Sequence, residues 1–109
     1  MTDAAVPTSD EALVLSGPLT TQTVGEIRQR MLDCLAGGSA CVLHAAGVTR
    51  LDAAGAQLLY AFVAEVTRRG STARWASASL YMVEAARMLG MESCLGLAGL
   101  PPEVASWQP

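Results

Sequence analysis

"LDAAGAQLL", residues 51–59, joins an apolar segment to an amphipathic helical pattern through one acid and several small residues. Asp52 suits the start of a helix, because its carboxylate can accept hydrogen bonds from the free amides of the first turn. An exposed helix start can hold a phosphate, carry a reactive hydroxyl or give a partner protein a smooth place to dock. The rest of the chain decides among these three uses.

Apolar runs alternate with helical periodicity along the chain. Runs that end at turn residues predict strands over residues 12–17, 40–45 and 72–76, and the 3.6-residue pattern predicts helices over about 20–36, 53–69 and 79–90. Thr20 or Thr21 is expected to cap the first helix and Ser79 the third. A further short strand is expected within 93–99 and a helical turn within 102–108.

Alternating strands and helices of this length predict an α/β domain. We expect about four strands in a mixed sheet, with the helices mainly on one face and the opposite face partly open. Residues 1–10 are expected to form an N-terminal tail or an edge strand, and residues 11–109 the domain itself.

Composition narrows the class of partner. A chain of 109 residues fits one domain, and seven Arg and no Lys against ten acids give a net charge of −3. The protein therefore has no positive field to gather nucleic acid. No apolar run approaches the roughly 20 residues needed to cross a bilayer, and the first residues lack the features of a signal peptide, so we expect a cytoplasmic protein.

The titratable and thiol side chains do not suggest catalysis. Cys34, Cys41 and Cys94 match neither a zinc site nor a redox pair, and they are expected to be small buried hydrophobic residues. Asp52 lacks an evident second titratable group, because His44 is the only histidine and cannot be placed beside it. We expect no enzyme activity, no metal and no cofactor, and the role of His44 stays open.

Phosphate binding is also disfavoured. The carboxylate of Asp52 would occupy or repel an anion at this helix start, and the chain contains no nucleotide-binding glycine motif and no nucleophile elbow.

Docking has a positive argument. Small residues in the first helical turn let a partner approach the backbone closely and leave little side-chain entropy to lose. The alternative is that they let the helix pack tightly on the sheet. Gln57 and Tyr60 follow on the expected accessible side, although a solvated Gln and a half-buried Tyr are comparable interpretations. The candidate partner-binding residues are Asp52, Ala53, Ala54, Gly55, Ala56, Gln57 and Tyr60.

Three segments in this order resemble the STAS domain, which anti-sigma factor antagonists share with the cytoplasmic tails of sulfate transporters. They are "CVLHAA" (41–46), "GVTRLDAAGAQLLYAFVAEVTRRG" (47–70) and "SASLYMVEAARMLGM" (77–91), and the resemblance covers residues 12 to about 97. It implies a non-enzymatic bacterial signal-transduction module that works by partner switching.

In the antagonists of this family, the residue after the Asp is a Ser or Thr that a partner kinase phosphorylates. Ala53 stands at that position here, so the resemblance implies a lost phosphorylation site. Two further departures are the turn over residues 17–20, which lacks the acids of many antagonists, and His44, where the strand often ends in Asp or Asn.

The chain is more similar to two other kinds of small STAS protein, those associated with chemotaxis clusters and the subunit that supports a lipid-transporting ABC ATPase. The implied partner is therefore an anti-sigma factor or kinase-like regulator, or else a transporter ATPase. A third hypothesis is a small-ligand or lipid binder that uses the open sheet face. The sequence does not predict the oligomeric state.

Overall fold

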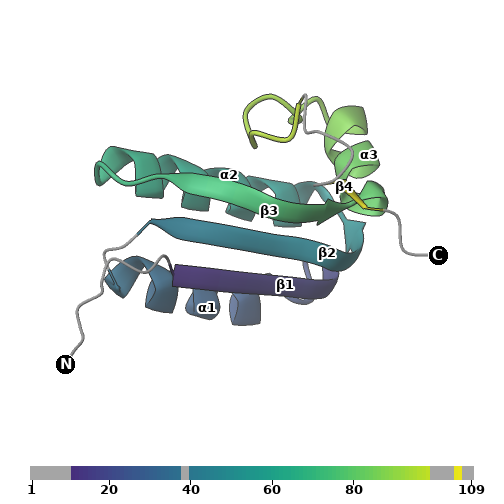
Figure 1. Ribbon diagram of the computed structural model, residues 1–109. Coiled ribbons are helices and arrows are strands. Elements are labelled where there is room, and N and C mark those ends of the chain that lie inside the picture. Colours follow the sequence, from purple (N-terminus) through teal and green to yellow (C-terminus); the bar gives the residue numbers. More distant parts are fainter. Residues whose placement is uncertain (1–10, 38–39, 99–104, 107–109) are drawn as a thin grey trace.

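The computed structural model describes residues 11–37, 40–98 and 105–106 (Figure 1). Strands and helices alternate along the chain. In order they are β1 (Glu11–Leu19), α1 (Val24–Ala36), β2 (Cys41–Leu51), α2 (Ala53–Arg68), β3 (Ala73–Ser79), α3 (Leu80–Met88) and β4 (Ala105–Ser106).

The sheet is entirely parallel, in the order β1-β2-β3-β4. The prediction of a mixed sheet is wrong, because each of the first two crossovers carries a helix and returns the chain in the same direction. Only three strands have full length, since β4 contributes two residues beside Ala78 and Ser79. The expectation of about four strands is corrected accordingly.

The C-terminal region differs from the sequence-based expectation in two respects. Residues 93–96, part of the segment 93–99 in which a short strand is expected, form turns, and Gly96 adopts the left-handed conformation there with a φ of 78°. Ala105–Ser106 form a strand where a helical turn was expected. The rest of the segment expected to form that turn lies outside the described residues.

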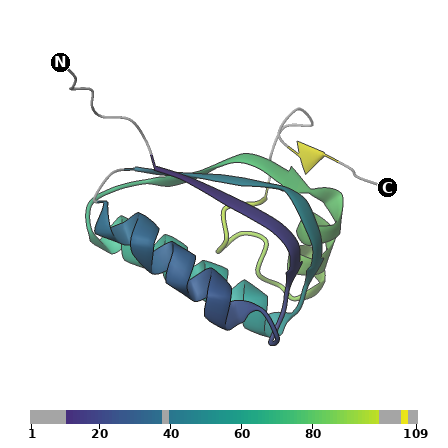
Figure 2. The same ribbon diagram turned by 90° about the horizontal axis from the view of Figure 1, so that it is seen from below.

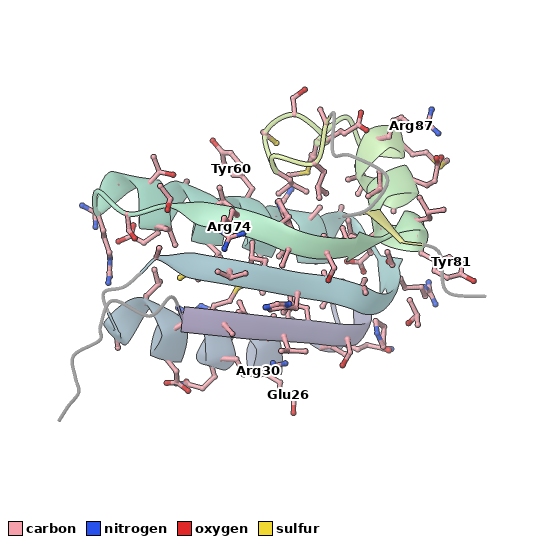
Figure 3. The ribbon with its side chains drawn as sticks, in the orientation of Figure 1. Glu26, Arg30, Tyr60, Arg74, Tyr81 and Arg87 are labelled. Carbon is pink, nitrogen blue, oxygen red and sulfur yellow. The ribbon has the colours of Figure 1, made fainter. Side chains whose placement is uncertain are left out.

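Helices α1 and α2 lie side by side on one face of the sheet, and α3 lies at the end of the sheet beside β2 and β3 (Figures 1 and 2). The strand pleat shows the same division, since Leu13 and Leu15 are buried in the core while Val14 between them is exposed. Arg74 lies on the uncovered face (Figure 3).

The centre of each helix face that the 3.6-residue pattern selects is buried, while its flanking members Val24, Leu35, Leu58, Val63 and Val83 are partly buried. The buried members are Ile27, Met31 and Cys34 of α1, Leu59, Phe62 and Val66 of α2, and Met82 and Ala86 of α3.

The same pattern places Leu89 on the buried face of the third helix with Met82 and Ala86, but Leu89 is 40% exposed because α3 ends one residue before it. Thr23, rather than Thr20 or Thr21, occupies the position before α1. Its hydroxyl donates to the carbonyl of Pro18 and accepts from the amide of Thr20 instead of capping the helix.

Candidate functional site

Asp52 caps α2 as the sequence predicts. Its Oδ1 accepts a hydrogen bond from the amide of Gly55 at 2.9 Å, and its own backbone is extended, as a residue preceding a helix requires. The amide of Asp52 donates to the carbonyl of Leu19, which ties the helix start to the end of β1. The cap therefore belongs to a junction between two strand ends.

The second carboxylate oxygen of Asp52 makes a contact that the sequence does not reveal. Oδ2 accepts from the amide of Thr21 at 3.0 Å and from its hydroxyl at 3.3 Å. The hydrogen bonds from Gly55 and then Thr21 lower the pKa of Asp52 below its ordinary value, because they stabilise the carboxylate. The hydrogen bonds that this carboxylate accepts come from the amides of Gly55 and Thr21 and from the Thr21 hydroxyl, as expected for a helix cap.

A polar recess of about 240 Å³ opens beside this junction. Asp52 is the only lining residue among the predicted site residues, because the recess is built from two segments some 30 positions apart that only the fold brings together. The lining residues are Thr20, Thr21, Gln22, Arg50 and Asp52.

Two of the seven predicted partner-binding residues do not face solvent. Gly55 and Ala56 are buried, and Ala56 is fully enclosed in the core. A Cβ on Gly55 would lie within 2.8 Å of the carbonyl carbon of Leu19 and closer still to its oxygen. Placing Gly55 and Ala56 on an accessible surface is therefore wrong, because a close crossing between α2 and β1 requires their small size.

The other predicted residues do lie toward the outside. Ala53, Gln57 and Tyr60 are exposed, at spacings of four and three residues that place them on one side of α2, while Asp52 and Ala54 are partly exposed. Tyr60 is 48% exposed and points outward (Figure 3). We call Ala53, Gln57 and Tyr60 the α2 surface.

The first three turns of α2 carry no charge. Residues 53–64 contain no Asp, Glu, Lys, Arg or His, although their solvent-facing positions include Ala61 and Ala64 beside the α2 surface. Exposed helix faces usually carry charged side chains. An uncharged exposed face with a central tyrosine is instead typical of protein contacts.

An apolar groove runs between α1 and α2 on the outer side of the helical layer. It has a volume of about 170 Å³, and Leu32, one of its lining residues, is 42% exposed. Its lining residues are Arg28, Met31, Leu32, Leu35, Leu58, Ala61, Phe62 and Glu65.

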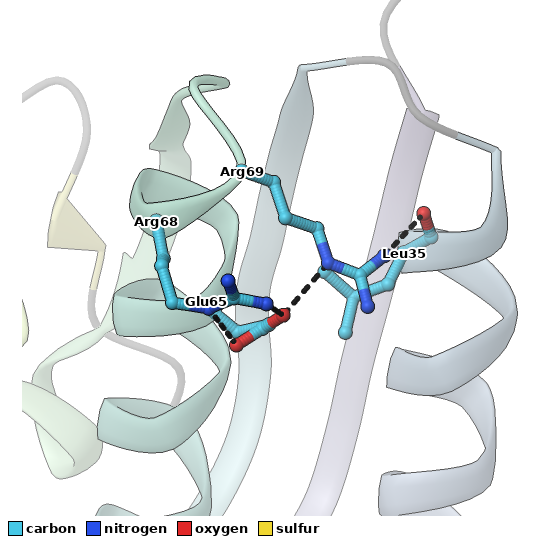
Figure 4. A network of polar contacts seen from close by, with 4 residues as sticks. All are labelled: Leu35, Glu65, Arg68 and Arg69. Carbon is cyan, nitrogen blue, oxygen red and sulfur yellow. Dashed lines mark hydrogen bonds and ion pairs between the residues drawn. The ribbon is translucent and has the colours of Figure 1, made fainter.

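A charged network closes one end of this groove (Figure 4). Glu65 accepts from Arg68 Nε at 3.0 Å and from Arg69 Nε at 2.8 Å, and Arg69 also donates to the carbonyl of Leu35 in α1 at 3.3 Å. The two guanidinium groups lower the pKa of Glu65 to about 2. The network therefore links the C-terminal ends of the two helices.

The remaining candidates show no constellation for catalysis in the described part of the chain. His44 pairs with Val14 in the middle of the sheet, whereas Asp52 follows the end of β2. No group of three or more potential metal ligands occurs within residues 11–37, 40–98 and 105–106. None of the helices in these ranges is long and apolar enough to span a membrane.

The arrangement is that of a three-helix parallel α/β module whose prominent surface is a capped, uncharged helix start. The sequence profile of one protein family, described as "Mlab, STAS domain", matches residues 4–105. The chain therefore belongs to the STAS domain family, as the resemblance in the sequence indicates. No curated protein and no solved structure gives a significant match to the chain.

Proposed function

We propose that this protein is a non-enzymatic regulatory STAS module that binds a protein partner through the α2 surface. Membership of the STAS family supports a regulatory role in general. One observation carries the proposal. Ala53, Gln57 and Tyr60 are exposed on one side of α2, and residues 53–64 of this helix contain no charged side chain. A partner that covers this face would have little charge to desolvate.

The groove between α1 and α2 extends the proposed interface. Leu32 and Ala61 offer exposed apolar area on the side of α2 that faces α1, whereas Tyr60 points away from α1 (Figure 3). Arg28 and Glu65 border the same groove with opposite charges, which can fix the orientation of a partner.

Phosphorylation of residue 53 cannot control partner binding in this protein. Ala53 is exposed at the helix start but has no oxygen to accept a phosphoryl group. We propose that the protein acts like an anti-sigma factor antagonist or a chemotaxis-associated STAS protein. Its binding would then be controlled by the availability of the partner or by modification of a residue other than Ala53. A transporter ATPase is the alternative partner.

The test uses Gln57→Arg, which places a long charged side chain on the α2 surface at an exposed position. The matched control is Met88→Arg on α3, where the native side chain is 85% exposed. Immobilised wild type and both variants are incubated with native extract, and the captured proteins are identified by mass spectrometry. We expect Gln57→Arg to reduce capture of the specific partner by about tenfold or more, whereas Met88→Arg retains it.

The identity of the captured protein distinguishes the alternatives. An anti-sigma factor or kinase-like regulator supports the antagonist-like role, and an ABC ATPase supports the transporter role. Equal capture by the wild type and Gln57→Arg would contradict docking at the α2 surface. A small molecule that co-purifies with wild type in the absence of any protein partner would favour the ligand-binding hypothesis instead.

A further inference from the structure

We propose that Cys34 and Cys41 form a peroxide-sensitive thiol pair that closes to an intramolecular disulfide. The Sγ atoms of these residues lie 3.1 Å apart, one from the last turn of α1 and the other from the first residue of β2. Formation of a bond of about 2.05 Å requires the two sulfurs to approach by about 1 Å. The two sulfurs are in hydrogen-bond contact, and no disulfide joins them in the structure.

The thiol pair lies where the backbone can make this small adjustment. Cys34 is two residues from the end of α1, and Gly37, the residue after the helix, is exposed. Cys41 begins β2 and is held by a backbone hydrogen bond to the carbonyl of Thr72. Movement of the helix end toward a fixed strand start is therefore sufficient to form the bond.

A cleft gives one of the two sulfurs a route to solvent. Cys34 lines an opening of about 270 Å³ together with Ala12, Leu13, Arg30 and Asp33. Cys41 is more deeply buried, at 1% exposed against 6% for Cys34. Cys34 is therefore the thiol that meets an oxidant, and Cys41 the thiol that resolves the product.

Size and charge select the class of oxidant. Cys34 is only 6% exposed, and the lining of the opening carries one guanidinium and one carboxylate, so a small reagent without charge has the best access to its sulfur. Hydrogen peroxide is small and uncharged, whereas a glutathione disulfide is bulky and anionic. We assign hydrogen peroxide as the oxidant.

The chemistry balances without any further reactant. The Cys34 thiolate attacks one oxygen of hydrogen peroxide, the O–O bond breaks, and the leaving hydroxide takes a proton to become water. The resulting sulfenic acid is attacked by the Cys41 sulfur, which forms the S–S bond and releases a second water. Two thiols lose two electrons in total, and one peroxide gains them.

Trypsin provides a direct assay, because the chain has no Lys and cleavage after Arg30 and Arg50 yields one peptide that contains both cysteines. Cys94 falls in a different peptide, after Arg87. The full-length reduced protein is treated with hydrogen peroxide, alkylated with iodoacetamide and digested. We expect peptide 31–50 to lose the mass of two hydrogens and take up no alkyl group, and dithiothreitol to reverse both changes.

Three cysteine variants refine the result. Cys94→Ser should form the same bond as wild type, whereas Cys34→Ser and Cys41→Ser should leave the remaining partner without a crosslink. If either core variant fails to fold, the wild-type peptide still decides the question.

Two alkylated cysteines in peptide 31–50 after peroxide treatment would overturn the proposal. Three other outcomes would also overturn it. They are sulfinic acid on Cys34 without a disulfide, crosslinks that join only separate chains through Cys94, and a Cys34–Cys41 bond that forms only in denaturant.

Discussion

The α-carbon of Gly55 in the first turn of α2 lies against the backbone of Leu19 at the end of β1, leaving no room for a Cβ atom. The same carbonyl of Leu19 accepts the hydrogen bond from the amide of Asp52. The strand end therefore fixes both the cap and the closest approach of the helix. This contact sets where α2 begins against β1, and it thereby positions Ala53, the first residue of the α2 surface.

Replacing Gly55 by Ala should destabilise the protein, although Ala is the better helix former. The added methyl group meets backbone rather than a movable side chain, so we expect a loss of about 1–3 kcal/mol in the free energy of unfolding. Urea unfolding with an unchanged m-value would measure this loss.

Gly25→Ala in α1 is the matched control for this prediction. A Cβ at Gly25 meets nothing within 4 Å, so the same substitution should stabilise the protein by about 0.5–1 kcal/mol. Equal effects of the two substitutions would contradict the close crossing of α2 and β1.

Asp52→Ala should lower the Tm by a few degrees at neutral pH, because the amides of Gly55 and Thr21 both lose their acceptor. The Tm of Asp52→Asn should lie between those of Asp52→Ala and wild type, since the amide oxygen of Asn can still accept one of these hydrogen bonds. Thermal unfolding followed by circular dichroism gives the comparison.

The effect of Asp52 should also depend on pH. Its pKa is lower in the folded protein than its ordinary value of 3.8, so its contribution to stability is present above that value. As the pH falls through the folded pKa, the contribution is lost. The Tm difference between wild type and Asp52→Ala should therefore narrow in acid, and a difference that stays constant down to pH ~2 would refute this origin.

Glu65→Gln should remove the link that Arg69 makes between the ends of α2 and α1. The folded pKa of Glu65 is about 2, against an ordinary value of 4.5. The stabilising effect is therefore present above pH 4.5 and disappears between 4.5 and about 2. The Tm difference from wild type should be small and should shrink further in 1 M salt, because the groups are near the surface.

A double-mutant cycle with Arg69→Gln tests whether the two charges act together. We expect the double variant to lose less than the sum of the two single variants. Strict additivity would show that the contact seen in Figure 4 contributes nothing to stability.

Ser79→Ala should destabilise the protein by about 1–3 kcal/mol, because two buried backbone groups lose their partner. The hydroxyl of Ser79 donates to the carbonyl of Val48 at 2.6 Å and accepts from the amide of Met82 at 3.1 Å. Ser93→Ala, at an exposed turn position, is the control and should change stability little. Chemical denaturation of both variants provides the measurement, and a Ser79→Ala variant as stable as the control would contradict this role.

Some features followed from local chemistry and were therefore predictable. Asp52 and Ser79 cap helices because a short polar side chain can reach amides within its own first turn. The alternation of strands and helices follows from periodicity along single segments, and it correctly predicts an α/β domain. The resemblance in residues 41–91 likewise led to the family that the profile confirms.

Other features depend on which segments the fold brings together. The sequence left two uses open for the small residues after Asp52, and the position of β1 assigns Gly55 and Ala56 to packing while Ala53 and Gln57 stay exposed. In the same way, the bond between Thr21 and Asp52 spans 31 positions.

The sequence by itself determined the caps of α2 and α3, the order of strands and helices as far as α3, and the family, because these are written in patterns along continuous segments. Only the tertiary structure decided the parallel register, the close contact of Gly55 with Leu19 and the meeting of Cys34 with Cys41. Each of these depends on a separation between elements, which is set by the packing of the whole core rather than by local side-chain preference.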